Sequence, residues 1–398
     1  MILSRGSGAL CSHRRASFYA SFKLRFLSTK AYDPLRILFC GSDHFSIASL
    51  KALHAEHVQH PDRIASIDVV CRPPKKVGRG MKDIREVPIK AAATELQLPI
   101  HEIDTFTGWR APVNLGQPIN LIVAVSFGLF VPPRILNGAK YGGLNVHPSL
   151  LPDFRGPAPL HHTLLAGRTR TGVTLQTLHL ERFDHGAILA QTPSPGIEIP
   201  NPDSCHVSQL LDVVAPKAAN MLVEGIRQGL FVPPVTDAGW YSSKQEELIH
   251  AAKIKPKDRH IDWANWTCAD IQRRHRVLTA LWSKSLVFDK PTGPKPTFQQ
   301  KRVILNKIEE VQPMKGSEAF ALVPGLPFID GEHTVKADSG KGVYVFTKDG
   351  KLIRIHQMTV EGQPLADALR AALKARLVGS RTFSSHDVPF APFHNPLF

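Results

Sequence analysis

The sequence predicts an α/β protein in which a Rossmann-like, parallel-sheet domain is followed by a smaller β-barrel domain. Short apolar strands alternate with helical segments up to about residue 230, as in parallel sheets. Leu121–Val125 is an unbroken apolar run rich in β-branched residues, which is typical of a strand buried on both faces. Beyond residue 300, several short strands are separated by turn signals, which favours a small barrel. With 398 residues, the chain can bury two cores.

The first 32 residues differ in composition from the rest of the chain. They contain six Lys or Arg side chains and many serines, but no Asp or Glu. This composition is typical of an organellar transit peptide over residues 1–32. It does not separate a mitochondrial from a chloroplast peptide, and we expect the mitochondrial one because it is more frequent. A disordered basic tail would have the same composition.

Composition excludes several classes of protein. No uninterrupted apolar segment approaches the roughly 20 residues that a membrane-spanning helix needs, so no membrane association is expected. The five cysteines lie far apart and none forms a C-x-x-C pair, which gives no basis for a zinc site or a disulfide framework. The balance of 43% hydrophobic and 21% charged residues is that of an ordinary folded protein.

The first domain is expected over residues 33–230. Asp33–Cys40 ends in a strand, and the turn after it leads into a helix that extends to about His57. Ser66–Cys71 predicts a second strand and Ile84–Leu96 the next helix. The first turn lacks the second and third glycines of G-x-G-x-x-G, so a dinucleotide cofactor is not expected.

A basic segment, Arg72–Lys82, separates that second strand from its helix. It carries five Lys or Arg side chains on a chain punctuated by proline and glycine. Such a segment predicts a mobile cationic arm suited to binding phosphates, if a nucleic acid is the partner. A solvated surface loop is the alternative.

Two polar residues lie on the second of two central strands, which are predicted at Leu121–Val125 and Gly143–His147. Side chains alternate along a strand, so Asn145 and His147 should share one face while Val146 points to the other. They lie at the carboxyl end of the strand, where open α/β sheets place their active sites. An amide donor beside an imidazole suits a carbonyl that becomes an oxyanion, although a single histidine in this place is more often structural.

Asp184 is the candidate carboxylate for the same site. Thr171–Leu180 alternates like a strand, and Ile188–Ala190 begins its return. The turn between them would hold Asp184 near the edge of the sheet. Sequence spacing does not show whether Asp184 meets Asn145 and His147.

A helical pattern at Ser204–Gln228 closes the first domain, and Pro216 within it predicts a kink or a break. Residues 231–246 form a predicted linker and residues 381–398 an unassigned tail. Between them, residues 247–380 form the second domain. Its clearest strands are predicted at Arg302–Ile308, Gly342–Thr347 and Lys351–Gln357, with a hairpin turn at Asp349-Gly350.

Charge distinguishes the two domains. Residues 247–398 hold 23 Lys and Arg against 15 Asp and Glu, whereas residues 33–246 hold 20 against 19, in a chain whose formal net charge is +15. An excess of positive charge concentrated in one small domain predicts a polyanionic partner. A generally basic surface is the alternative.

The central motifs resemble those of a known enzyme family. N-V-H-x-S-L-L-P-x-x-R-G-x-A-P from Asn145, followed by D-x-G from Asp184, resembles the 10-formyltetrahydrofolate-dependent formyltransferases. The rest of the chain is similar to the branch of that family that formylates initiator Met-tRNA. The resemblance implies that Asn145, His147 and Asp184 form the catalytic set, without a metal. Asn145 would orient the formyl oxygen, His147 would stabilise developing charge and assist proton transfer, and Asp184 would pair with His147 or position a water.

The same resemblance implies binding sites for both substrates. The 10-formyltetrahydrofolate site is expected at Phe127, Gly128, Leu129, Ser149, Leu150, Leu151 and Pro152. Contact with tRNA is expected from Lys75, Lys76, Arg79 and Lys82, and from an oligonucleotide-binding-type (OB-like) barrel in the second domain.

The predicted activity is therefore formylation of Met-tRNA for translation initiation in the mitochondrial matrix, with no stable protein partner implied. Two alternatives remain. One is a formyltransferase for a small molecule, such as glycinamide ribonucleotide or an amino sugar. The other is a catalytically inactive RNA-binding translation factor.

Overall fold

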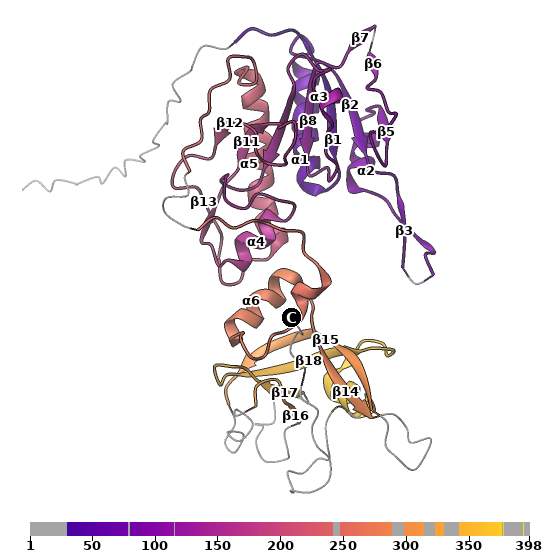
Figure 1. Cartoon of the computed structure of the whole chain (residues 1–398), viewed down its shortest axis with the longest axis vertical. Helices are drawn as coiled ribbons and strands as arrows, with labels where there is room; N and C mark the ends of the chain where they lie inside the picture. Colours follow the sequence, from indigo (N-terminus) through magenta and orange to yellow (C-terminus); the bar gives the residue numbers. More distant parts are fainter. Residues whose placement is uncertain are drawn as a thin grey trace, which may run out of the picture.

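The computed structural model describes residues 30–78, 80–114, 116–241, 247–288, 298–313, 323–329, 342–375, 377 and 393. Nearly all of the predicted transit peptide, Arg79, and all of the predicted tail except Phe393 lie outside the described residues. Figure 1 shows the described chain as an upper part built on one large sheet and a lower part of antiparallel strands. Among the described helices, none is both long and apolar enough to cross a membrane.

The upper part is organised around a seven-stranded sheet with the order β12-β11-β9-β8-β1-β2-β5. Five of these strands are parallel. The expectation of a Rossmann-like parallel sheet is thus confirmed for them, whereas β11 and β12 extend the sheet in antiparallel fashion. The bounds are Leu35–Gly41 (β1), Ile64–Cys71 (β2), Ile100–Glu102 (β5), Leu121–Val125 (β8), Gly143–His147 (β9), Thr174–Thr177 (β11) and Ile188–Gln191 (β12).

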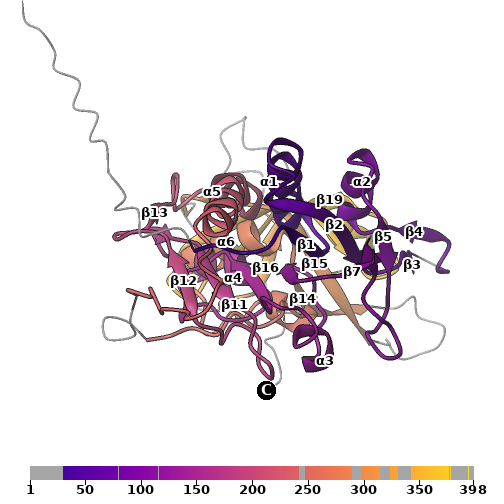
Figure 2. The same cartoon turned by 90° about the horizontal axis from the view of Figure 1, so that it is seen from above.

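Helices cover both faces of this sheet. α1 (His44–Gln59), α2 (Pro88–Glu95) and α5 (Val207–Arg227) lie on one face, and α3 (Pro133–Leu136) lies on the other (Figure 2). Alternate residues of β8 accordingly belong to different cores, because Val123 packs in one apolar cluster and Ile122 in the other. A strand buried on both sides needs apolar residues at every position, which explains the unbroken Leu121–Val125 run.

Of the two outcomes predicted at Pro216, a kink or a break, the break is wrong. α5 continues as one helix from Val207 to Arg227. Pro216 is exposed, whereas its neighbours Val214 and Ala218 are buried. A proline on the solvent side of a helix removes one hydrogen bond where water can satisfy the freed carbonyl, so packing of the buried face holds the helix together.

The helix predicted at Ile84–Leu96 begins later than expected, at Pro88. Asp83–Arg85 is instead a short strand (β4) that pairs with Lys75–Val77 (β3), so the expected loop is a two-stranded hairpin. Ile84 is 68% exposed on this hairpin, and therefore its apolar side chain was no sign of a buried helical face. Figure 1 shows the hairpin as an arm that projects from the upper part.

Four short strands form two further two-stranded sheets in the upper part, β6 with β7 and β10 with β13. Their bounds are Val113–Asn114 (β6), Gln117–Pro118 (β7), Arg170–Thr171 (β10) and Ile197–Glu198 (β13). A seven-residue helix, α4 (Pro159–Leu165), follows the central loop and faces the lower part (Figure 1).

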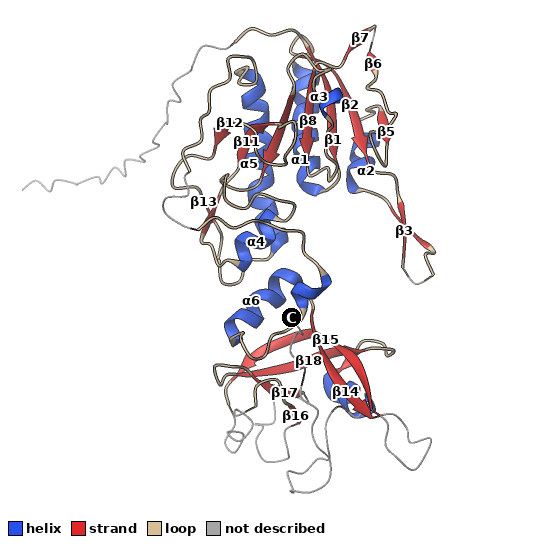
Figure 3. Ribbon diagram, in the orientation of Figure 1, coloured by secondary structure: helices blue, strands red, loops and turns tan. Residues whose placement is uncertain are grey.

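The lower part is an antiparallel sheet curled into a half-barrel, in the order β14-β15-β18-β17-β16, with β19 paired to β18. The predicted second-domain strands and the hairpin turn at Asp349-Gly350 are confirmed. Figure 3 shows helix α6 between this sheet and the upper part. The bounds are Pro256–Arg259 (η1), Cys268–Leu278 (α6), Leu281–Phe288 (β14), Phe298–Val311 (β15), Pro327–Ile329 (β16), Val343–Phe346 (β17), Leu352–Val360 (β18), Ala366–Asp367 (β19) and Ala368–Ala375 (α8).

Main-chain hydrogen bonds attach the segment that leads into the lower part to the loop after β9 in the upper part. We call residues 249–251 the junction segment. The N–H of Phe154 donates to the carbonyl of Ile249 (2.8 Å), and the N–H of Ala251 donates to the carbonyl of Arg155 (2.7 Å). Gly156 lies so close that a Cβ on it would be 2.5 Å from the carbonyl oxygen of Ala251. The loop after β9 is therefore shaped in part by residues almost a hundred positions later.

Candidate active site

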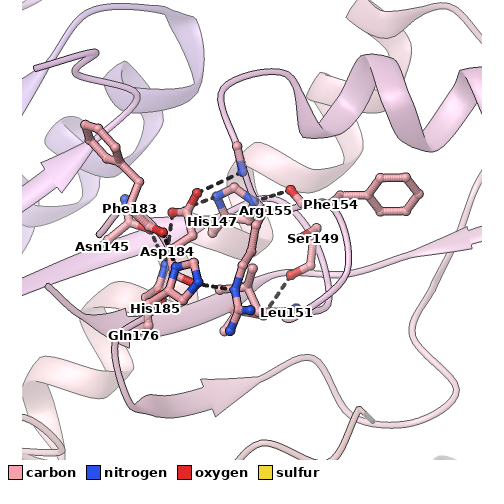
Figure 4. A network of polar contacts seen from close by, with 12 residues as sticks. Asn145, His147, Ser149, Leu151, Phe154, Arg155, Gln176, Phe183, Asp184 and His185 are labelled. Carbon is pink, nitrogen blue, oxygen red and sulfur yellow. Dashed lines mark hydrogen bonds and ion pairs between the residues drawn. The ribbon is translucent and has the colours of Figure 1, made fainter. Parts of the chain in front are cut away.

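The three predicted catalytic side chains meet in one polar network at the carboxyl end of β9 (Figure 4). Asn145 and His147 lie on one face of β9, and Val146 packs in the apolar cluster on the other, as the alternation predicts. Asp184 comes from the turn between β11 and β12. β11 runs antiparallel to β9 and ends with Thr177 opposite Leu144, near the start of β9. The segment after Thr177 folds back, so that Asp184 contacts Gln176 and His147.

The amide of Asn145 is held in a defined orientation. Its Nδ2 donates to the carbonyl oxygen of Ala124 on β8 (2.8 Å), and its Oδ1 accepts from Nε2 of Gln176 (3.0 Å). An amide nitrogen carries two hydrogens, so one N–H of Asn145 remains for another acceptor. Asn145 is partly buried, which gives a substrate atom access to it.

Both ring nitrogens of His147 face oxygen atoms. Nε2 lies 2.9 Å from the carbonyl oxygen of Phe154, and Nδ1 lies 3.4 Å from Oδ1 of Asp184. The ring can donate to both oxygens only when both nitrogens carry hydrogen, that is, as a positively charged imidazolium. His147 is 5% exposed, so this charge would act in a setting poor in water.

Asp184 is held by its backbone and its side chain together. Its φ of 56° lies in the left-handed region, and its carbonyl accepts from Nε of Arg155 (2.7 Å). Oδ2 accepts from the N–H of Gly156 (3.0 Å), and Oδ1 accepts from Gln176 (3.2 Å). Arg155 and Gly156 of the loop therefore hold Asp184 in place. These contacts give a physical reason for the R-G pair and for the aspartate of D-x-G.

Gln176 is a member of the network that the sequence did not reveal. It lies on β11 directly opposite Asn145 and is 1% exposed. The signal that could have found it is strand register, because the residue paired with Asn145 must share its face of the sheet. That register depends on a pairing that the sequence alone does not specify.

The residues predicted to bind folate lie in two different settings. Gly128 adopts a φ of 77° and borders open space, whereas Phe127 packs in the core against Phe106. Ser149, Leu150 and Leu151 are buried, and Ser149 donates its hydroxyl to the carbonyl of Asp153 (2.7 Å). Direct folate contact by the members of this set remains a prediction.

A hollow of about 220 Å³ adjoins this region. Leu129 and Phe130 line one side of it, and Arg134 contributes a guanidinium that donates to the carbonyls of Trp109 (2.8 Å) and Phe106. The remaining lining residues are Thr105, Phe106, Thr107 and Pro132. An apolar hollow with one cation suits a flat, partly anionic ligand.

One further carboxylate, Asp43, lies at the turn between β1 and α1. Its side chain accepts from the N–H of Ser46 (3.1 Å) and so caps α1. Burial raises the pKa of Asp43, although hydrogen bonds from Ser46 and Ser126 act in the opposite direction. Asp43 follows β1 and so lies at the same edge of the sheet as the candidate site. Its contact with the side chain of Ser126 helps to hold the residue that precedes Phe127.

The three described lysines predicted to contact tRNA do not join the catalytic network. Lys75, Lys76 and Lys82 lie exposed on or next to the β3–β4 hairpin. Within the described ranges, no group of three or more His, Cys, Asp or Glu side chains is placed to hold a metal ion.

Comparison with known proteins gives consistent matches in both parts of the chain. Residues 35–209 match the family described as formyl transferase, and residues 253–373 match the formyl transferase C-terminal domain. The mitochondrial methionyl-tRNA formyltransferase of Saccharomyces cerevisiae is 34% identical over 294 residues, covering 65% of this chain and 72% of that protein. The methionyl-tRNA formyltransferase of Cereibacter sphaeroides (strain KD131) is 29% identical, covering 85% of this chain and 99% of that protein.

Among solved structures, an N-formyltransferase from Helicobacter canadensis, in complex with folinic acid and dTDP-3-aminofucose, aligns with a TM-score of 0.47 and 13% identity. The alignment covers 81% of this chain and 98% of that chain.

Proposed function

The chain belongs to the methionyl-tRNA formyltransferase family, and from that premise we propose how it transfers a formyl group to the α-amine of methionine on initiator tRNA. The activity serves mitochondrial translation initiation. The formyl donor is 10-formyltetrahydrofolate, and the observation that carries the proposal is the joint placement of Asn145, His147 and Asp184 at the end of β9.

The chemistry needs a site that stabilises a tetrahedral oxyanion. The amine nitrogen attacks the formyl carbon, the bond from that carbon to N10 of the folate breaks, and a proton passes from the amine to N10. The free N–H of Asn145 donates to the formyl oxygen, and positive charge on His147 stabilises the oxyanion. Asp184 holds His147 and positions a water that carries the proton.

The folate fits the region beside this network. We place the pterin against Gly128, because a Cβ there would meet no atom within 4 Å and its φ of 77° turns the chain at this point. The neighbouring hollow, which Leu129, Phe130 and Arg134 help to line, suits the aromatic and acidic tail of the folate.

Met-tRNA is bound by the basic arm and by the lower part. The arm carries Lys75, Lys76 and Lys82 in the described chain, and the sequence adds Arg79 to the same basic segment. The excess of Lys and Arg over residues 247–398 supplies a wider surface for phosphates. A small amino acceptor would need neither feature.

The enzyme acts in mitochondria, and we place it in the matrix. Residues 1–32 should direct a fluorescent passenger protein there, and an enzyme without them should be active. Cytosolic retention of the passenger would contradict this assignment.

The deciding experiment is an assay of formyl transfer from labelled 10-formyltetrahydrofolate to Met-tRNA, glycinamide ribonucleotide and an amino sugar in parallel. Label should pass to Met-tRNA alone. Transfer to one of the small amines instead would establish the first alternative activity, and tRNA binding without any transfer would establish an inactive RNA-binding factor.

A further inference from the structure

Gln176 occupies a place from which it contacts two of the three proposed catalytic residues. It lies on β11, opposite Asn145 on β9, and is almost fully buried. Its Nε2 lies 3.0 Å from Oδ1 of Asn145 and 3.2 Å from Oδ1 of Asp184, so each of its two hydrogens has one acceptor (Figure 4). One side chain therefore connects the amide and the carboxylate of the site.

The orientation of the Gln176 amide is fixed by chemistry. An ionised carboxylate can only accept hydrogen bonds, so the nitrogen of Gln176 must face Asp184. Turning the amide over would place Oε1 against two oxygens, those of Asp184 and Asn145. The same orientation leaves Oε1 of Gln176 buried with no hydrogen-bond partner among the described residues.

The two hydrogen bonds that Gln176 makes both come from its nitrogen, and they go to Asn145 and Asp184. A buried polar side chain is retained where its hydrogen bonds are used. The glutamine at this position is therefore explained by what its nitrogen does for these two neighbours.

We propose that Gln176 is a positioning residue for formyl transfer, an inference that rests on the proposed function. It holds Oδ1 of Asn145, while the carbonyl of Ala124 holds one hydrogen of Nδ2. Together they fix the amide plane, so that the remaining Nδ2 hydrogen faces the formyl oxygen. Its second hydrogen bond keeps Oδ1 of Asp184 in the direction of Nδ1 of His147.

Replacing Gln176 by methionine removes both hydrogen bonds and keeps the length of the side chain. Since a displacement of about 1 Å at a reacting centre lowers rate by up to roughly 100-fold, Gln176→Met should lower kcat by about 10- to 100-fold and leave KM for both substrates nearly unchanged. Gln228→Met is the matched control, because Gln228 also donates its Nε2 to a carboxylate, that of Glu224 (2.6 Å), far from the site. The control should keep full activity.

Replacing Gln176 by glutamate gives a readout that a purely structural role would not produce. When protonated, the glutamate can donate one hydrogen to Asn145 or Asp184; when ionised, it repels both. The other charged groups of the network, His147 and Arg155, are unchanged. The ratio of Gln176→Glu activity to wild-type activity should therefore rise as pH is lowered, whereas the ratio for Gln176→Met should not change with pH.

Crystal structures of the variants test the inference separately from activity. In Gln176→Met the Asn145 amide should turn away from the carbonyl of Ala124 or occupy two orientations. An unchanged Asn145 together with wild-type kcat and a pH-independent Gln176→Glu ratio would overturn the positioning role while leaving formyl transfer intact. A wild-type enzyme that formylates nothing would instead overturn the proposed function, and the orientation of Asn145 in the crystals would still decide the role of Gln176.

Discussion

Gly186 packs directly against the carbonyl oxygen of Thr177, so that a Cβ on Gly186 would lie 1.7 Å from that oxygen. No side chain fits without a shift of main chain. The glycine of D-x-G is therefore required by the close approach of β11 to the turn that carries Asp184.

Gly186→Ala should lower the free energy of unfolding by about 3 kcal/mol, because overpacking against backbone cannot be relieved by a side-chain rotation. Urea unfolding measures the change. Gly138→Ala is the matched control, since its Cβ would meet its nearest atoms at an ordinary 3.4 Å, and it should change stability far less. A fully stable Gly186→Ala protein would contradict the close approach.

Asn145→Ala and His147→Ala should each raise the barrier of the chemical step by about 2.7 to 4 kcal/mol, the range for removing one group that stabilises an oxyanion. Single-turnover formylation measures the chemical step, and circular dichroism checks that each variant is folded. A folded His147→Ala protein with near-normal turnover would remove His147 from the mechanism.

Stability should fall as the pH drops below about 6.5, because two partly buried histidines resist protonation in the folded chain. Burial lowers the pKa of His161, and the nearby charges of His162 and Arg259 lower it further; burial likewise lowers the pKa of His275, against a hydrogen bond to Leu305. The unfolded chain then binds protons that the folded chain does not, so the stability present above about pH 6.5 is lost on acidification.

This effect is measured as the free energy of unfolding in urea between about pH 7.5 and 5.5. Each pKa unit of separation contributes about 1.4 kcal/mol. A His161→Gln, His275→Gln double variant should show a shallower dependence. An equally steep decline in the double variant would assign the effect to other groups.

The arm should contribute to tRNA binding through its charge. Lys75→Ala with Lys76→Ala should weaken Met-tRNA binding, and each lost phosphate contact should reduce the salt slope of log affinity by about 0.9 on a duplex. Lys51→Ala with Lys217→Ala removes the same charge from exposed helix positions and is the control. Arg79→Ala should impair formylation with little change in folate binding. If both double-lysine variants changed Met-tRNA affinity and its salt slope equally, the arm would be an ordinary solvated surface.

The central strands could be predicted to the residue because two local signals agree there. Leu121–Val125 is apolar throughout, and Gly143–His147 begins at a glycine and ends before a proline. The start of α2 was missed because Ile84 continued an apolar pattern, and only its pairing across the hairpin with Lys76 shows that it belongs to a strand.

The candidate site was predictable only in part for a related reason. Alternation along one strand placed Asn145 and His147 on the same face. The contact of Asp184 with His147, and all of the role of Gln176, depend on the register between β9 and β11, which is a property of two segments about 30 residues apart. Propensity and periodicity act within a segment and do not fix such a register.

The junction segment limits how this protein can be recombined with others. A chimaera that joins a foreign RNA-binding module in the linker, before Ile249, would leave the N–H of Phe154 and the carbonyl of Arg155 without their main-chain partners. The carbonyl of Phe154 is the one that faces His147. The exchange would therefore disturb the catalytic site in the upper part, even though no residue of the upper part was altered. A graft should therefore keep this chain's own residues through Ala251 and begin the foreign module after them.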